Sequence, residues 1–349
     1  MRILISGASI AGPSLAYWLA RQGTEVTLVE RAAGRRLGGA PIDIRAEAVE
    51  LTAKMGLLDA VEAVRGNTRG IVFVDADGAE AQTIPNTDDH DIELYRGELV
   101  RILTDATKDE VEYIYGDGVT ALHDDGAGVD VEFARGAPRR FDLVFGADGL
   151  HSQVRRLTFG PEQEFLRHVG VYVAIFPCDP ALGKPDWGLM RQTPGRLVGV
   201  YSFRGTGKAA FMFRAPRLDY DYRDIGRQKN LLRETFADHG WIVPQLLDGA
   251  LDTEDFYFDS VSQVDLPSWS RGRIALIGDA AACPSPLTGM GTSAAMLGAA
   301  ALAEALAEHT DHETAFAEYE RKFRPRADEI QSMVSTGVEM LVPLRPVAT

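Results

Sequence analysis

The N-terminal segment alternates between apolar runs and turns. Arg2 to Ser6 is a continuous apolar run with two β-branched residues, which is typical of a strand buried on both faces. A turn of small residues, Gly7 to Gly12, follows it. Pro13 then fits the first turn of a helix, because its missing N–H needs no partner there. A second apolar run, Glu25 to Val29, ends at Glu30. This order predicts a strand, a turn, a helix and a second strand, the beginning of a parallel α/β sheet.

The small residues of this turn suit the binding of a dinucleotide. They let the backbone approach a pyrophosphate that lies at the helix N-terminus, while an acidic residue after the second strand binds the ribose hydroxyls. Ser9 replaces the second glycine of the usual pattern but still offers its backbone N–H. Glu30 would repel a 2′-phosphate, so NADP suits this particular site poorly. The glycine turn taken alone is also compatible with ordinary turn chemistry.

Two further buried strands end in turns that contain glycine and aspartate. The run from Arg140 reaches Asp148, and the run from Arg273 reaches Asp279. Pro284 to Thr292 and an alanine-rich helix follow the second turn. A helix that starts near Thr292 would point unpaired N–H groups at any anion in front of it. Each aspartate is alternatively a simple turn former.

The segment between these two turns has a different pattern. Runs with the period of two expected of strands alternate with one helical segment, Gly226 to His239. The predicted strands are His168 to Phe176, Leu197 to Phe203, Ala209 to Arg214 and Asp255 to Val264. Consecutive strands without helical crossovers predict a mostly antiparallel sheet. We therefore expect an inserted domain of residues 161–269 within a Rossmann-like domain of residues 1–160 and 270–349, which ends in C-terminal helices.

Composition excludes several classes of protein. Of the 349 residues, 45% are hydrophobic and 25% are charged, which is ordinary for a globular chain. The net charge of −15 disfavours nucleic acid or an anionic membrane as a partner. No apolar run approaches the roughly 20 residues that span a bilayer. Cys178 and Cys283 make no disulfide framework, and no metal-binding motif occurs. A reducing cytoplasm is the default location.

The three turn motifs together resemble one enzyme family. They occur in the order found in FAD-dependent aromatic hydroxylases of the para-hydroxybenzoate hydroxylase type, the single-component flavoprotein monooxygenases, and span residues 3 to about 306. The chain is most similar to compact bacterial hydroxylases of phenolic and polyketide compounds, including the tetracycline-inactivating type. The resemblance implies non-covalent FAD, NADPH or NADH as a transient electron donor, and O₂. It also implies a small aromatic substrate, oxygenated through a flavin C4a-hydroperoxide.

The resemblance assigns roles to individual residues. The residues assigned to FAD are Ser9, Ile10, Ala11, Gly12, Glu30, Arg31, Arg96, Val119, Asp148, Asp279, Pro286, Gly289, Gly291 and Thr292. Glu30 would bind the adenosine ribose, with Arg31 and Val119 near the adenine. Asp279 would hold the ribityl chain, and Asp148 belongs to a motif used for FAD and for the nicotinamide donor. Apart from the resemblance, the aromatic residues of the inserted domain could line an apolar pocket, and we assign Phe211, Phe213 and Leu287 to the substrate; a structural sheet core explains the two phenylalanines at least as well.

Two positions depart from the family pattern, and several alternatives remain open. Many relatives have Asn where this chain has Ser293, and an acidic residue where it has Gly298. A flavin-dependent reductase or a halogenase-like enzyme would use the same scaffold, although the Trp-x-Trp-x-Ile-Pro stretch of halogenases is absent. A non-catalytic FAD- or ligand-binding protein is a further alternative. The sequence identifies no catalytic base and allows a monomer or a homodimer.

Overall fold

The computed structural model describes residues 1–36, 38–87, 90–221 and 223–345. Its first sheet has the order β17-β18-β11-β1-β2-β7. Five strands run parallel: β1 (Arg2–Ser6), β2 (Glu25–Glu30), β7 (Val111–Tyr115), β11 (Leu143–Gly146) and β18 (Ile274–Leu276). The short β17 (Ser270–Arg271) joins the edge in the antiparallel sense. The apolar run of β1 is buried as predicted, with Ile3, Leu4 and Ile5 all 0% exposed.

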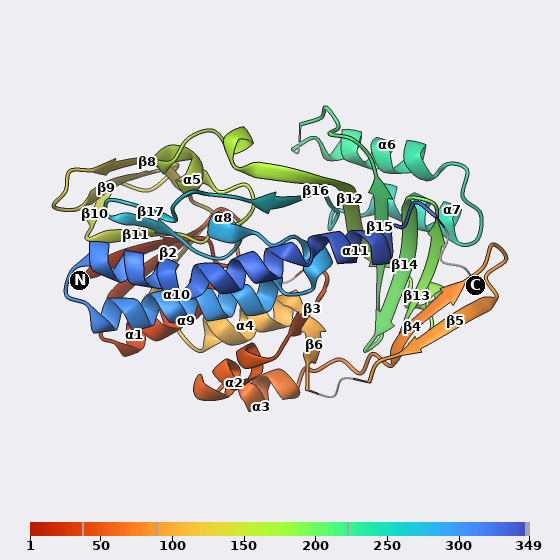
Figure 1. Cartoon of the computed structure of the whole chain (residues 1–349), viewed down its shortest axis with the longest axis horizontal. Coiled ribbons are helices and arrows are strands. Elements are labelled where there is room, and N and C mark those ends of the chain that lie inside the picture. The colour runs from red at the N-terminus through yellow and green to blue at the C-terminus, as the bar shows by residue number, and fades with distance from the viewer. Residues whose placement is uncertain (37, 88–89, 222, 346–349) are drawn as a thin grey trace.

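Helices and a small sheet complete this half of the molecule, which lies on the left in Figure 1. Helix α9 (Gly291–Glu308) packs against both α1 (Ala11–Arg21) and α10 (His312–Ser332). The other helices of this half are α2 (Glu47–Lys54), α3 (Leu58–Glu62), α4 (Arg96–Asp105), α5 (Gln153–Thr158) and α8 (Asp279–Ala282). The small sheet consists of β8 (Val119–Asp124), β9 (Val129–Phe133) and β10 (Arg139–Phe141), and β3 (Pro41–Ile44) pairs with β6 (Ile92–Tyr95).

The second half is built on a seven-stranded sheet, which we call the large sheet. Its order is β16-β12-β15-β14-β13-β4-β5. The strands are β4 (Gly70–Val74), β5 (Glu80–Pro85), β12 (Leu166–Cys178), β13 (Trp187–Thr193), β14 (Arg196–Phe203), β15 (Thr206–Arg214) and β16 (Tyr257–Val264). All neighbours are antiparallel except β13 and β4. Two helices, α6 (Ile225–Phe236) and α7 (Val243–Asp252), cover one face.

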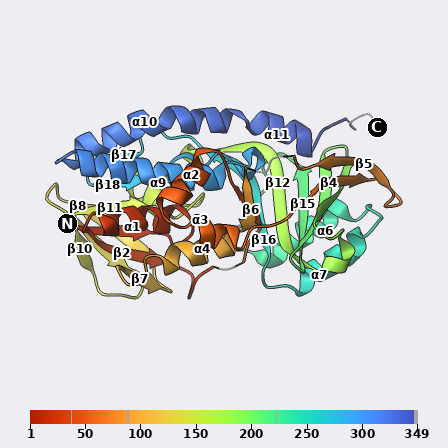
Figure 2. The same ribbon diagram turned by 90° about the horizontal axis from the view of Figure 1, so that it is seen from below.

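The C-terminal helices connect the two halves. Figure 2 shows α10 and α11 (Val334–Leu341) running one after the other along the same side of the molecule, from the parallel sheet to the large sheet. Helix α11 contacts the short 3₁₀ helix η3 (Pro286–Thr288). Two other 3₁₀ turns, η1 (Glu162–Glu164) and η2 (Pro180–Leu182), flank β12. Within the described residues, no helix is both long and apolar enough to cross a membrane.

The predicted fold class is confirmed, with one difference in how the chain is divided. A parallel α/β sheet, a mostly antiparallel second sheet and C-terminal helices are all present. Residues 70–85, however, form β4 and β5 and belong to the large sheet, whereas the sequence placed them in the first domain. Pairing between such distant segments leaves no local pattern in the sequence. Strand β13 and helix α7 were also not predicted.

Candidate functional site

The turn after β1 forms a close-packed cradle at the N-terminus of α1. A Cβ atom at Gly12 would lie 1.9 Å from the carbonyl oxygen of Gly7, so only glycine allows this turn. No side chain caps α1, and its first turn contains no acidic residue. The backbone of Ser9, Ile10 and Ala11 lies at this end of the helix, as predicted. Free N–H groups and the helix dipole make such a terminus suited to a phosphate.

Glu30 closes one side of the cradle at the end of β2. Its two carboxylate oxygens accept hydrogen bonds of 2.9 Å from the backbone N–H groups of Ala8 and Ala32. These bonds fix the orientation of the carboxylate, and each oxygen keeps a lone pair for a hydroxyl donor. Arg31 is exposed and lies over Gly118, where a Cβ would be 3.1 Å from the Arg31 Cγ. Val119 follows directly at the start of β8.

Arg96 lies on the other side of the same cradle, at the start of α4. Its guanidinium donates to the Ser9 hydroxyl at 3.1 Å and to the Gly38 carbonyl at 2.5 Å. Burial lowers the pKa of Arg96. Among the described residues no carboxylate forms an ion pair with it. A half-buried guanidinium that is held only by neutral oxygens keeps its charge for an anionic ligand.

The second half of the cradle follows β18. Asp279 begins α8, and burial raises the pKa of its carboxyl, which also contacts the Cys283 thiol. The loop then turns sharply at Ser285, whose φ of +83° is unusual for a residue with a side chain. The Ser285 hydroxyl accepts a 3.1 Å hydrogen bond from the Leu287 N–H and so holds the turn. We call residues 284–292 the flavin loop, in keeping with the prediction for Pro286, Gly289, Gly291 and Thr292.

Helix α9 begins at the end of the flavin loop. Its N-terminus has no side-chain cap and no acidic residue in the first turn. The positive end of this helix, which is 18 residues long, therefore faces the loop without a partner from its own side chains. A negative charge in front of it would be stabilised by about 0.3–1 kcal/mol, and by more when buried. This is the arrangement that the sequence predicted around Thr292.

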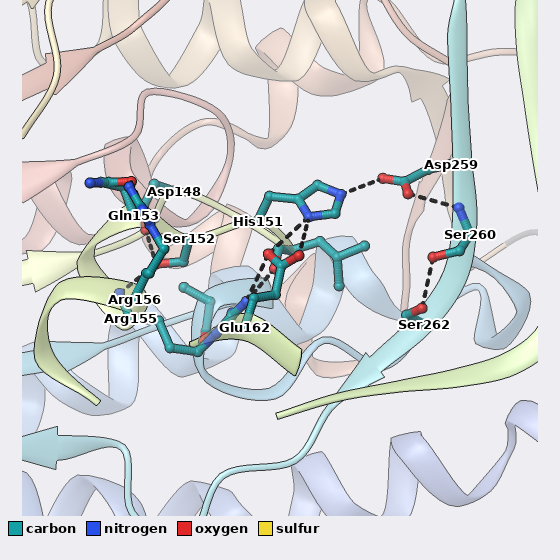
Figure 3. Close-up of polar contacts among 12 residues, drawn as sticks. Asp148, His151, Ser152, Gln153, Arg155, Arg156, Glu162, Asp259, Ser260 and Ser262 are labelled. Atoms are coloured by element: carbon teal, nitrogen blue, oxygen red, sulfur yellow. Dashed lines mark hydrogen bonds and ion pairs between the residues drawn. The ribbon is translucent and has the colours of Figure 1, made fainter. Parts of the chain in front are cut away.

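Asp148 is the predicted cofactor residue that the structure uses differently. One carboxylate oxygen accepts from the backbone N–H groups of Gln153 and Val154 at 2.9 and 3.0 Å, and the other accepts from the Ser152 hydroxyl (Figure 3). The carboxylate thus satisfies the N-terminus of α5. The alternative reading of Asp148 as a turn former describes this geometry, and a direct contact with a cofactor is not supported.

Phe211 and Phe213 are not placed where a substrate contact requires. They are 0% and 3% exposed and lie on the face of β15 that packs against α6 and α7. The Phe211 ring is 4.9 Å from the Phe236 ring, centroid to centroid. Leu287 of the flavin loop instead joins the apolar cluster on the opposite face of the large sheet. The assignment of both phenylalanines to the substrate is therefore wrong, because they belong to the core beneath the helices.

Comparison with known proteins agrees with this geometry. A family model described as an FAD binding domain matches residues 1–333. An uncharacterized protein of Mycobacterium tuberculosis (strain ATCC 25618 / H37Rv) is 43% identical and covers 98% of this chain and 95% of the relative. A flavin-dependent monooxygenase from an unknown prokaryotic organism is 40% identical and covers 95% and 88%. The crystal structure of tetracycline destructase Tet(55) superposes with a TM-score of 0.91 at 37% identity, covering 99% of this chain and 91% of that one.

The chain belongs to the FAD-dependent aromatic hydroxylase family. It is a flavoprotein monooxygenase, and its cofactor is FAD. The residues present fit that cofactor. Two uncapped helix N-termini, those of α1 and α9, face the same cradle, and Arg96 adds a half-buried cation that forms no ion pair with a carboxylate among the described residues. Among the described residues, no group of three or more His, Cys, Asp or Glu side chains is arranged to hold a metal ion.

The two departures from the hydroxylase pattern have structural explanations. Ser293 is 0% exposed, and its hydroxyl accepts a 2.9 Å hydrogen bond from the backbone N–H of Arg45. Gly298 faces α10, where a Cβ would lie 2.9 Å from Phe323. Ser293 therefore fixes the corner between β3 and α2, and Gly298 allows close packing of α9 and α10. Neither substitution removes a group that the backbone cradle needs.

Sequence reasoning missed Arg45, which reaches the flavin loop from the end of β3. Its guanidinium forms a 2.5 Å ion pair with Asp43 and lies against Gly289, where a Cβ would be 3.3 Å from Nη2. The following residue, Ala46, has a φ of +47°. The signal available in the sequence was a lone arginine between a short strand and a helix, which is too common a pattern to be informative by itself.

Proposed function

We propose that this monooxygenase hydroxylates an electron-rich aromatic or polyketide-like small molecule, with NADH or NADPH as the electron donor and O₂ as the oxygen source. The observation that carries the proposal is the meeting of the flavin loop with an apolar face of the large sheet. Leu287 packs with Val173, Met190 and Val338 in one cluster. Apolar walls next to a redox cofactor exclude water and favour a flat, apolar substrate.

The residues of the cradle have separate tasks in this proposal. FAD supplies the redox chemistry, in which the nicotinamide donor provides electrons and O₂ provides the transferred atom. Arg96 and the α1 N-terminus bind the pyrophosphate, and Glu30 accepts hydrogen bonds from the adenosine ribose. Asp279 binds the ribityl chain. The α9 N-terminus stabilises negative charge on the reduced ring without any side chain that would have to move.

The proposed substrate class rests on similarity and on the apolar cluster together. The tetracycline destructase Tet(55) shares 37% of its residues with this chain over nearly its whole length. A fused-ring phenolic polyketide would extend over the apolar face that Leu287 and the sheet form. Simple phenols and heteroaromatic hydroxy acids are the smaller members of the same chemical class and serve as comparison compounds.

The test is substrate-stimulated oxidation of NADH and NADPH by the FAD-loaded protein. A panel would include a tetracycline, a simple phenol and a saturated analogue, with products analysed by mass spectrometry. We expect stimulation by aromatic compounds and a product that has gained one oxygen atom, in the presence of O₂ only. Product formation that continues without O₂ would indicate a reductase and contradict the proposal. Stimulation by none of the aromatic compounds would contradict the substrate class.

A further inference from the structure

A histidine that the cofactor cradle does not use lies between two carboxylates (Figure 3). The Nδ1 atom of His151 is 2.9 Å from a carboxylate oxygen of Glu162, and its Nε2 atom is 2.9 Å from a carboxylate oxygen of Asp259. The three side chains are 19%, 25% and 9% exposed, respectively. Carboxylates only accept hydrogen bonds, so both ring nitrogens carry a proton and the ring is an imidazolium.

His151 and its two carboxylate partners come from different parts of the molecule. Asp259 lies on β16, the edge strand of the large sheet, and Glu162 lies in η1, which leads into β12. His151 itself follows β11 of the parallel sheet and precedes α5. The imidazolium therefore joins the half of the molecule that carries the cofactor cradle to the edge of the large sheet.

Arg155 extends the contact to the flavin side. This side chain is 0% exposed, and its guanidinium donates to the Ala280 carbonyl at 3.0 Å and to the Leu150 carbonyl. It also lies 3.6 Å from Glu162. Ala280 is the residue after Asp279 in α8. A continuous set of polar contacts thus runs from β16, through His151, Glu162 and Arg155, to the segment that carries Asp279.

Each cation of this set faces a carboxylate of the set. Two cations, His151 and Arg155, face two anions, Asp259 and Glu162. Burial lowers the pKa of His151, but the hydrogen bonds and charges of the two carboxylates outweigh burial and raise it to about 10. The other groups that face these carboxylates are Arg217 near Glu162, and Tyr172, Tyr220 and Tyr257 near Asp259. Asp148 and Asp279 also face Arg155. Because its members are paired with opposite charges, the set resists their separation.

We propose that His151 is a positioning residue, a clamp between two carboxylates that holds the edge of the large sheet against the cofactor-binding half and so fixes the position of the sheet over the flavin loop. The clamp joins His151 and Arg155 of the cofactor-binding half to Glu162 and Asp259, which lie before β12 and on β16 of the large sheet. This proposal does not depend on the proposed substrate, because it concerns the relative position of two parts of the protein.

The first test measures the charge state directly. In FAD-loaded protein labelled with ¹⁵N at histidine, one ring is expected to remain doubly protonated at about pH 8, where ordinary histidines are neutral. His151→Gln should remove that signal. Asp259→Asn should shift it toward the neutral form, because one anionic partner is lost. A His151 ring that is neutral at this pH in the parent protein would overturn the proposal.

The second test follows amide hydrogen exchange in the FAD-loaded variants. His151→Gln should speed exchange on both sides of the junction, in β16 and in residues 279–283, by about tenfold or more, as expected when a buried charge pair is broken. Asp259→Asn should do the same, and the double variant should add little to either single one. Asp259→Asn has nearly the shape of the parent, so it remains informative if His151→Gln does not fold.

His239→Gln is the matched control. His239 contacts Asp238 at 3.0 Å and also Thr193 and Arg196 of the large sheet at 3.2 and 3.3 Å, so all of its partners lie in the same half of the molecule. Its effect on exchange should stay local to the end of α6 and the adjoining ends of β13 and β14, and should not reach β16 or residues 279–283. Faster exchange confined to one side of the junction in His151→Gln, or additive effects in the double variant, would overturn the clamp.

Discussion

Gly337 of α11 touches the backbone of Leu287 in the flavin loop. A Cβ atom at Gly337 would lie 2.2 Å from the Leu287 carbonyl oxygen, which is far inside contact distance. The C-terminal helix therefore rests directly on the loop, and its side chains Val334 and Val338 pack in the same apolar cluster as Leu287. The position of this loop depends on the last helix as well as on the strand and helix that flank it.

Gly337→Ala should push α11 away from the flavin loop. We expect a loss of about 1–3 kcal/mol in the free energy of unfolding, the usual range for overpacking, because the contacted atom belongs to the backbone. Urea unfolding of the FAD-loaded protein measures this loss. Gly249→Ala in α7 is the control: it has open space around it and should be neutral or stabilising by up to about 1 kcal/mol. Equal stability of Gly337→Ala and the parent would show that the contact is not restrictive.

Asp279→Asn should weaken the retention of FAD. The carboxylate begins α8 beside the cradle. Replacing a charge-assisted hydrogen bond with a neutral one costs at most about 1.5–3 kcal/mol, which is roughly a ten- to hundredfold loss of affinity. The FAD content after gel filtration and a titration of the apoprotein measure this effect. Asp248→Asn on the exposed side of α7 is the matched control. Equal FAD affinity in Asp279→Asn and the parent would count against the assignment of Asp279.

Asp148→Ala should behave in the opposite way. Because the carboxylate satisfies the N-terminus of α5, its removal should lower stability by about 1–2 kcal/mol in both the apoprotein and the FAD-loaded protein. FAD affinity should stay close to that of the parent. Thermal unfolding with and without FAD, together with a titration, separates the two effects. A specific loss of FAD affinity without loss of apoprotein stability would restore Asp148 to the cofactor site.

His151 should make the stability depend on pH above neutrality. Its pKa is raised from 6.5 to about 10 by its two carboxylates, so the folded state binds a proton that the unfolded chain releases earlier. The contribution is complete below about pH 6.5 and is lost as the pH rises to about 10, with a slope of at most about 1.4 kcal/mol per pH unit. Urea midpoints of the parent and His151→Gln should converge across this range. A difference that does not change with pH would contradict the prediction.

The sequence was most informative where one short segment contains a complete structural motif. The turn from Gly7 to Gly12 and the turn at Asp279 are complete within a few residues, because a strand end, a helix N-terminus and a tight turn are consecutive in the chain. Asp148 shows the limit of such reasoning. Its turn was located correctly, but only the structure shows that the carboxylate is taken up by the backbone of α5.

The second half of the fold was harder to predict, for a physical reason. The alternation in β15 places Phe211 and Phe213 on one face and Met212 on the other, but nothing local says which face meets the flavin loop. Helices α6 and α7 decide this by covering the phenylalanine face. Ser293, Gly298 and Arg45 were unclear for the same reason, since each acts on a partner that is distant in the chain.

The pairing of β4 with β13 limits how this protein can be divided. The large sheet is completed by a hairpin from the first third of the chain, so residues 161–269 alone would leave β13 as a bare edge with unpaired N–H and C=O groups. In a chimera that exchanges only that segment with a relative, β4 and β13 would come from different proteins, and their pairing would be mismatched. Recombination that alters substrate preference must therefore exchange residues 70–85 and residues 161–269 together.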